Sequence, residues 1–185
     1  RAPESSRIKS GDTWFGSPPI HLPAREVVAG FDESTTFNPG WLRKISRALV
    51  EGMRIVLPLA YSVGVGYAIV YSAMPYVEDD NWWGMSRHLA LCGALYGAGS
   101  MLLVLALKWL LLGRYKPSAH PMWTPFVWCS EAVTNMYESM AVMSFLNYLR
   151  GTPMLPWAMR LFGAKIGHGV YLDTTDMTEF DCVSI

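Results

Sequence analysis

The sequence is poor in charge, and its few charges are balanced. Charged residues make up 16% of the 185 residues, against about 25% in an ordinary soluble domain. Lys and Arg total 15, as do Asp and Glu, so the formal net charge is zero. This balance excludes a nucleic-acid-binding protein that works by neutralising phosphates. Together with a hydrophobic content of 51%, it also excludes an intrinsically disordered chain.

The sequence also lacks the common motifs of metal, redox and nucleophilic chemistry. Cys92, Cys129 and Cys182 are widely spaced and form no CxxC pair, which disfavours a zinc ribbon, a redox site or a disulfide scaffold. We find no P-loop, no GxSxG or SxxK motif and no paired-histidine motif, and we expect no metal site. A basic-then-apolar leader is absent, and we interpret the chain as a piece of a longer polypeptide.

What the sequence does contain is two long runs without charge, Ile55–Met74 and Leu89–Leu107. A helix of about 20 residues matches the ~30 Å hydrocarbon core of a bilayer. The alternative, a pair of buried helices in a soluble protein, is disfavoured because soluble core helices rarely run so far without charge. We therefore predict a transmembrane helix pair within residues 41–117, joined by the loop Pro75–His88.

Basic residues flank this pair on one side and predict its orientation. They precede the first run and follow the second, so both ends should be cytoplasmic and the loop should face outward. The basic segment 43–54 is also expected to contact anionic lipid, although plain orientation signalling explains it equally. Lys108 should snorkel to the interface. Small residues four apart, such as Gly93 and Gly97, favour close helix packing and leave self-association into a homo-oligomer open.

Residues 118–150 are expected to form an amphipathic helix at the cytoplasmic interface. Glu131, Asn135 and Glu138 would share one face, and apolar residues another. Because two acids inside a membrane span would be costly, an interfacial helix fits better than a third crossing.

The sequence pattern changes in residues 151–185, after a break in the helical pattern at Thr152–Pro156. Ile166–Gly167 and Leu172–Asp173 open six-residue steps, as in a left-handed parallel β-helix, where successive coils bury an aliphatic position. A short β-hairpin is the alternative. The expected fold class is therefore mixed. It comprises an α-helical transmembrane hairpin and an interfacial amphipathic helix, flanked by exit and entry strips of left-handed β-helix units.

Residues 149–185 carry the most specific resemblance in the chain. They resemble the entry into the β-helix units of membrane-bound, single-module nonribosomal peptide synthetases similar to ε-poly-L-lysine synthetase. Residues 11–25 resemble the exit of a preceding unit. The resemblance implies that residues 1–40 are an exit strip and linker, and that residues 151–185 start the next unit.

The resemblance also implies a bacterial cell-membrane enzyme that forms amide or isopeptide bonds between carrier-activated amino acids. ATP, Mg²⁺ and 4′-phosphopantetheine would act elsewhere in the parent protein, and no cofactor is expected in this region. Its implied partners are the lipid bilayer and the adenylation, carrier and further β-helix units of the same chain. Nucleic acid is not an expected partner. On this interpretation the region is a connector without a complete active site.

Two features are candidates for chemistry. Hexapeptide acyltransferases often use a histidine as general base, and His168 lies in an early coil of the expected β-helix, although a turn or surface position explains it better. The acids of the last segment could bind a cationic amine, although capping of turns is the simpler explanation; they are Asp173, Asp176, Glu179 and Asp181.

Two other functions remain open at this stage. The parent protein could be a membrane-bound hexapeptide-type acyltransferase that acts on a sugar or lipid. It could also be a non-enzymatic membrane scaffold. An upstream adenylation and carrier region would separate the synthetase from both alternatives.

Overall fold

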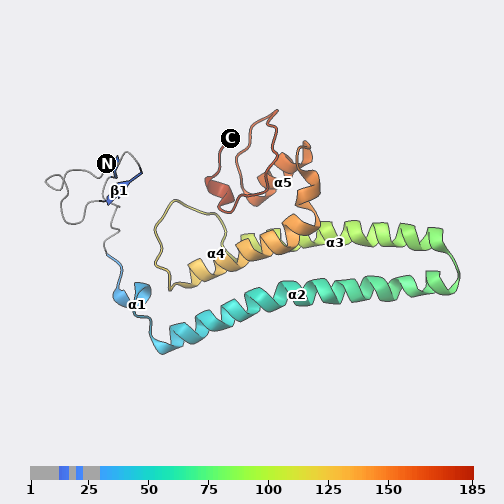
Figure 1. Ribbon diagram of the computed structural model, residues 1–185, viewed down its shortest axis with the longest axis horizontal. Coiled ribbons are helices and arrows are strands. Elements are labelled where there is room, and N and C mark those ends of the chain that lie inside the picture. The colour runs from blue at the N-terminus through green and yellow to red at the C-terminus, as the bar shows by residue number, and fades with distance from the viewer. Residues whose placement is uncertain (1–12, 17–19, 23–29) are drawn as a thin grey trace. The chain divides into compact units, whose positions relative to one another are not determined.

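A computed structural model describes residues 13–16, 20–22 and 30–185 (Figure 1). The chain divides into two compact units, Arg1–Phe31 and Asp32–Ile185, which are considered separately. In the first unit, strands β1 (Thr13–Phe15) and β2 (Ile20–Leu22) pair in antiparallel register. The predicted β-helix exit strip is therefore wrong where it can be judged, because these strands form a hairpin rather than parallel coils. The rest of residues 1–29 lies outside the described residues.

The second unit is built on a long antiparallel helical hairpin. After the short helix α1 (Glu33–Thr36), helix α2 spans Trp41–Glu78 and helix α3 spans Trp82–Leu111. The turn between them is tight because Asp80 adopts a positive φ of 53°. The Asn81 side chain then accepts a hydrogen bond from the Gly84 N–H, at 2.8 Å, and caps α3.

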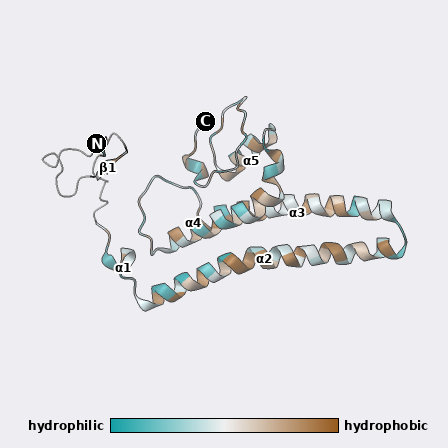
Figure 2. Cartoon of the chain, viewed as in Figure 1, coloured by the Kyte–Doolittle hydropathy of each residue, from teal (hydrophilic) through white to brown (hydrophobic). Residues whose placement is uncertain are grey.

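Both predicted charge-free runs lie inside these helices. α2 and α3 are long and apolar enough to cross a membrane, and Figure 2 colours residues toward the hydrophobic end of the scale along both helices. Protein buries few of these side chains, because only 6% and 22% of the most apolar window of each helix is buried. The expectation of two membrane-compatible helices is thus confirmed at the level of length and composition.

Residues 125–185 form a compact body, here called the cap, which packs on one side of α3 (Figure 1). Its aromatic centre consists of Tyr137, Phe162 and Phe180, whose ring centroids lie 4.9–5.5 Å apart. Met101 and Val104 of α3 complete this core. The elements of the cap are α4 (Pro125–Met136), the π-helix η2 (Tyr137–Val142), the 3₁₀ turns η3 (Leu146–Leu149) and η4 (Phe180–Cys182), and α5 (Met154–Phe162).

The predicted amphipathic helix is therefore interrupted, and much of its apolar face packs against protein. Val133 and Met140 are each 2% exposed, whereas Met143 is 71% exposed. Glu131 and Glu138 remain on the opposite, more accessible side. The prediction of helical structure is correct for α4. Most of its apolar face, however, packs against the cap core and α3 rather than lying at the membrane interface.

The predicted left-handed β-helix entry in residues 151–185 is wrong. Residues 154–162 form helix α5, because apolar side chains recur at helical spacing and give the helix one buried face. The remainder is irregular, with one isolated parallel bridge between Lys165 and Ser184. The aliphatic residues expected at the coil steps, Ile166 and Leu172, are buried in the cap core instead. The buried face of α5 is Leu155, Ala158, Met159 and Phe162.

Candidate functional site

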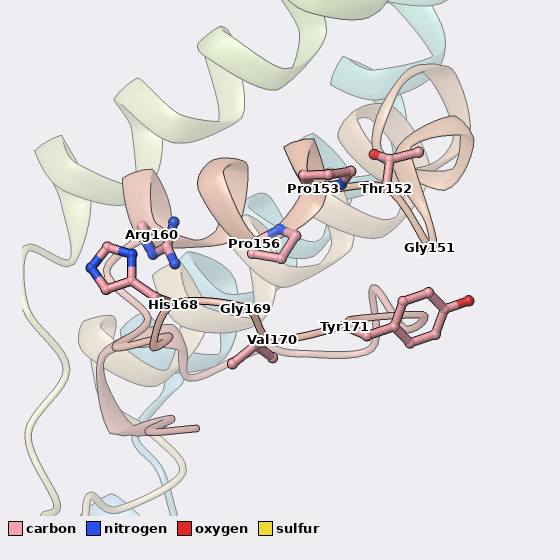
Figure 3. A pocket seen from close by; sticks show the side chains of 9 residues that line it. All are labelled: Gly151, Thr152, Pro153, Pro156, Arg160, His168, Gly169, Val170 and Tyr171. Carbon is pink, nitrogen blue, oxygen red and sulfur yellow. The ribbon is translucent and has the colours of Figure 1, made fainter.

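His168 lies at one end of an open groove of about 360 Å³ between α5 and the following loop (Figure 3). Arg160 fixes this end, because its Nε and Nη2 atoms donate hydrogen bonds to the carbonyls of Ile166 and Gly167, at 2.9 and 2.6 Å. His168 follows directly and is exposed. The groove is lined by Gly151, Thr152, Pro153, Pro156, Arg160, His168, Gly169, Val170 and Tyr171.

The other end of the groove is fixed by contacts around Gly151. Its N–H donates to the carbonyl of Leu172 at 2.9 Å, and its φ is +71°. A Cβ atom at this position would approach the Tyr171 hydroxyl to 3.0 Å. The neighbouring Arg150 donates to the carbonyl of Asp173. Hydrogen bonds to backbone carbonyls therefore frame the groove at both ends.

The groove brings a histidine and an arginine side by side but supplies no catalytic dyad among the described residues. A general base is normally oriented by a second group that fixes its tautomer, and no carboxylate or hydroxyl holds the His168 ring. Two of the donor atoms of Arg160 are already hydrogen-bonded to carbonyls of the loop. The arrangement is suited to contacting a ligand rather than to transferring a proton along a fixed path.

The four acidic candidates do not converge. Asp173 is exposed and pairs with Arg150, with 3.4 Å between Oδ1 and Nε. Asp176 is exposed, and Glu179 lines a separate cleft. Asp181 is buried. Across the described part of the chain, no group of three or more His, Cys, Asp or Glu residues could hold a metal ion.

Asp181 belongs instead to a buried ion pair that anchors the cap to the hairpin. Its Oδ2 atom lies 2.6 Å from Nζ of Lys108, and the two side chains are 8% and 0% exposed. The same oxygen accepts the backbone N–H of Tyr115 at 3.1 Å. Burial raises the pKa of the Tyr115 hydroxyl. The positive φ of Gly163 is needed here, because a Cβ atom would overlap the Asp181 carboxylate.

Sequence reasoning placed Lys108 at the membrane interface and missed this pair. One signal was present, because Lys108 is the only charge between Leu89 and Leu112. A charge in such a setting needs a partner when it is buried. Its partner lies 73 residues away, which no local pattern could identify.

A second set of charges joins α2 to α4. Arg47 pairs with Glu51 and Glu131, and Arg54 lies 2.8 Å from Glu51 and 3.6 Å from Glu131. Two of the basic residues expected to meet lipid headgroups are therefore engaged with acids of the protein. A cleft of about 380 Å³ lies beside this network, and its lining is largely polar and acidic. It consists of Arg54, Ser130, Glu131, Thr134, Asn135, Glu138, Thr178 and Glu179.

The chain is 50% identical over all 185 residues to the Delta-poly-L-ornithine synthetase of Acinetobacter baumannii (strain AB307-0294). The chain resembles part of a synthetase. It spans only 14% of that relative's length, so in the relative this region is accompanied by a much larger remainder of the same polypeptide. No family model matches the chain, and no solved structure matches it.

Proposed function

We propose that this chain is the membrane-embedded connector region of an enzyme similar to a nonribosomal peptide synthetase, which forms amide or isopeptide bonds between carrier-activated amino acids. The observation that carries the proposal is the 50% identity over the whole chain to a synthetase named for poly-L-ornithine. Similarity over the whole of this region supports a common role for it in both proteins.

The geometry supports an anchoring role for the hairpin. α2 and α3 expose apolar side chains along most of their length, as helices in contact with lipid do. A hairpin returns the chain to the side from which it entered, so both flanking segments would face the cytoplasm, where basic residues gather. The cap, fixed to α3 by Lys108 and Asp181, would hold adjoining domains at a set distance from the bilayer.

The chemistry of bond formation would then reside elsewhere in the parent protein. We propose that an adenylation domain uses ATP and Mg²⁺ to activate the amino acid, and that a carrier domain holds it on 4′-phosphopantetheine. By analogy with the relative's name, the substrate class is a diamino acid such as ornithine. This region would supply position rather than reacting groups.

The parent protein, purified from membranes, provides the test. We expect its intact mass to include a covalent phosphopantetheine, and its product with ornithine and ATP to be a ladder of masses spaced by one ornithine residue. Absence of the arm together with absence of any amino-acid ladder would refute the synthetase assignment.

The anchoring role needs a separate measurement. In the full-length protein, Val63→Asp places a charge on an exposed position of α2 within the charge-free run. We expect this variant to lose resistance to carbonate extraction from membranes, whereas Lys165→Asp, on the surface of the cap, should not. Equal extraction of the wild type and both variants would contradict membrane embedding.

A further inference from the structure

The cap reaches deep along α3, well into its charge-free run. It approaches α3 closely at Gly97, where a Cβ atom would lie 2.7 Å from the carbonyl oxygen of Ser144 and 3.2 Å from the ring of Phe145. Gly97 precedes Leu107, the end of the run, by about 15 Å at 1.5 Å per residue. That distance is about half the ~30 Å thickness of a hydrocarbon core.

The contacts of the cap with α2 give a similar depth. A cleft of about 380 Å³ is lined on one side by α2 from Arg54 to Ser62, and on the other by Asn135 and Ser139 of the cap. Arg54 is the last charge before the apolar run, and Ser62 lies about 12 Å beyond it along the helix. Ser62 also contacts Tyr96, next to Gly97, with 3.0 Å between their hydroxyl oxygens. The contacts on α2 and on α3 therefore give similar values for the depth to which the cap extends along the hairpin.

α3 also exposes apolar side chains at this level. While Val104 faces the cap and is fully buried, Leu102 and Leu110 are 55% and 81% exposed. Apolar exposure thus continues along α3 beside the whole stretch that the cap covers. If lipid contacts these leucines, the cap segment opposite them lies at the same depth.

The part of the cap at this depth carries no charge. From Ser139 to Leu149 the sequence has no Asp, Glu, Lys or Arg. Met143 and Tyr148 are 71% and 79% exposed, so the apolar character is presented outward as well as inward. Exposed Met154 and Trp157, at 59% each, extend this surface along α5.

Protein groups hydrogen-bond to several backbone groups in and beside the irregular part of the segment. Ser144 Oγ donates to the carbonyl of Met140 at 2.5 Å, and the N–H of Tyr148 donates to the carbonyl of Phe145 at 3.1 Å. The N–H and hydroxyl of Thr152 both donate to the carbonyl of Leu149. Non-helical backbone at membrane depth is tolerated only where it is buried or paired in this way.

We propose that residues 139–149 form a re-entrant segment that enters one leaflet of the bilayer without crossing it, with Met143 and Tyr148 in contact with lipid acyl chains. The leaflet is the one through which α2 enters. The inference rests on the proposed membrane crossing by α2 and α3, and it adds a third lipid-immersed element to the region. The sequence alone predicts a helix that lies flat on the membrane surface. The proposal instead places this segment inside the bilayer, where it extends to about the middle of the hydrocarbon core.

The test uses the full-length protein in vesicles permeabilised so that both faces meet the reagent. Single substitutions Met143→Cys, Val63→Cys and Lys165→Cys are treated with a membrane-impermeant maleimide, and labelling is read at each site by peptide mass spectrometry. We expect Met143→Cys to react at least about tenfold more slowly than Lys165→Cys, because hydrocarbon excludes both the reagent and the thiolate. Val63→Cys, within α2, should be protected to the same degree.

A second measurement separates lipid from another protein domain as the protecting partner. Vesicles of phosphatidylcholine carrying a diazirine on the acyl chain are irradiated, and the sites of lipid attachment are mapped. Attachment within residues 139–149 supports the proposal. Protection without attachment, or rapid labelling of Met143→Cys while Val63→Cys is protected, overturns it. Rapid labelling of Val63→Cys instead overturns the membrane crossing itself.

Discussion

Lys108, near the end of α3, and Asp181, in the last turn of the cap, meet in a salt bridge from which water is almost fully excluded, with 2.6 Å between Nζ and Oδ2. Breaking a buried pair by removing one partner leaves an uncompensated charge and costs about 3–5 kcal/mol. Lys108→Met and Asp181→Asn should therefore each loosen the cap. Hydrogen exchange of peptides covering residues 154–182 in the full-length protein measures the effect.

The exposed pair Arg150–Asp173 is the matched control for that experiment. Its side chains are 45% and 58% exposed, and exposed pairs contribute about 0–1 kcal/mol. Asp173→Asn should leave exchange in the same peptides nearly unchanged. The combined change Lys108→Met with Asp181→Leu should restore part of the protection, since no buried charge remains. Equal effects of the exposed and buried substitutions would contradict the anchoring role of the buried pair.

Gly97 and Gly93 offer a second matched pair on α3. A side chain at Gly97 would overlap Ser144 and Phe145, whereas nothing lies within 4 Å of a Cβ atom at Gly93. Gly97→Leu should therefore push the cap away from α3 and increase proteolytic cleavage within residues 142–152. Gly93→Leu should match the wild type. Resistance of both variants to proteolysis would show that the cap does not depend on close approach at Gly97.

Tyr137 should make the cap sensitive to alkaline pH. Burial raises the pKa of its hydroxyl well above the ordinary value of 10, and the hydroxyl donates to the carbonyl of Thr175 at 2.7 Å. Above about pH 10 the unfolded chain loses this proton while the folded cap retains it, so stability falls with rising pH. Below pH 10 both states are protonated and Tyr137 contributes no slope.

The variant Tyr137→Phe isolates this effect. It should cost about 1 kcal/mol at neutral pH through the lost hydrogen bond, yet show a shallower loss of stability between pH 10 and 11.5. Hydrogen exchange of the cap at matched intrinsic exchange rates provides the measurement. Parallel pH profiles for the two proteins would place the alkaline sensitivity at other groups.

His168 should prove dispensable for bond formation. A general base contributes about 10²- to 10⁴-fold to rate, but His168 is exposed and its ring has no orienting partner in the described structure. We expect His168→Ala to lower product formation by the parent enzyme less than about threefold. Arg160→Ala, which frees the loop from its two carbonyl contacts, serves as a structural comparison. A loss of a hundredfold or more in His168→Ala alone would restore His168 as a candidate base.

The helical hairpin was predictable because it follows from a local property of the sequence. A run without charge as long as Ile55–Met74 favours a helix that can cross a membrane, and it is recognised without knowledge of distant residues. The β-helix interpretation failed because Ile166 and Leu172 were read as period-six steps. Two buried aliphatic residues six positions apart fit a β-helix and an irregular segment packed on a helical core equally well. Only the packing against α5 distinguishes the two folds.

The candidate site could be predicted only in part, for a related reason. His168 was singled out by its neighbours in sequence, and the structure places it in a groove. The separation of Asp181 from Asp173 could not be foreseen, because it depends on the distant Lys108 and on Arg150. Pairing between residues 73 positions apart arises only in the folded chain and cannot be recognised from the periodicity of the sequence.

The π-helical turn at Tyr137–Val142 acts as a one-residue insertion in an otherwise α-helical course. Tyr137, Met140 and Ala141 within it are all buried in the cap core. The turn itself therefore contributes side chains to the packing of the core. Everything beyond it is rotated by about 100° relative to an uninterrupted helix. A single deletion here would therefore leave α4 in place and swing Met143 toward a different side of the molecule. The direction in which this chain presents its most exposed methionine is thus determined by one surplus residue.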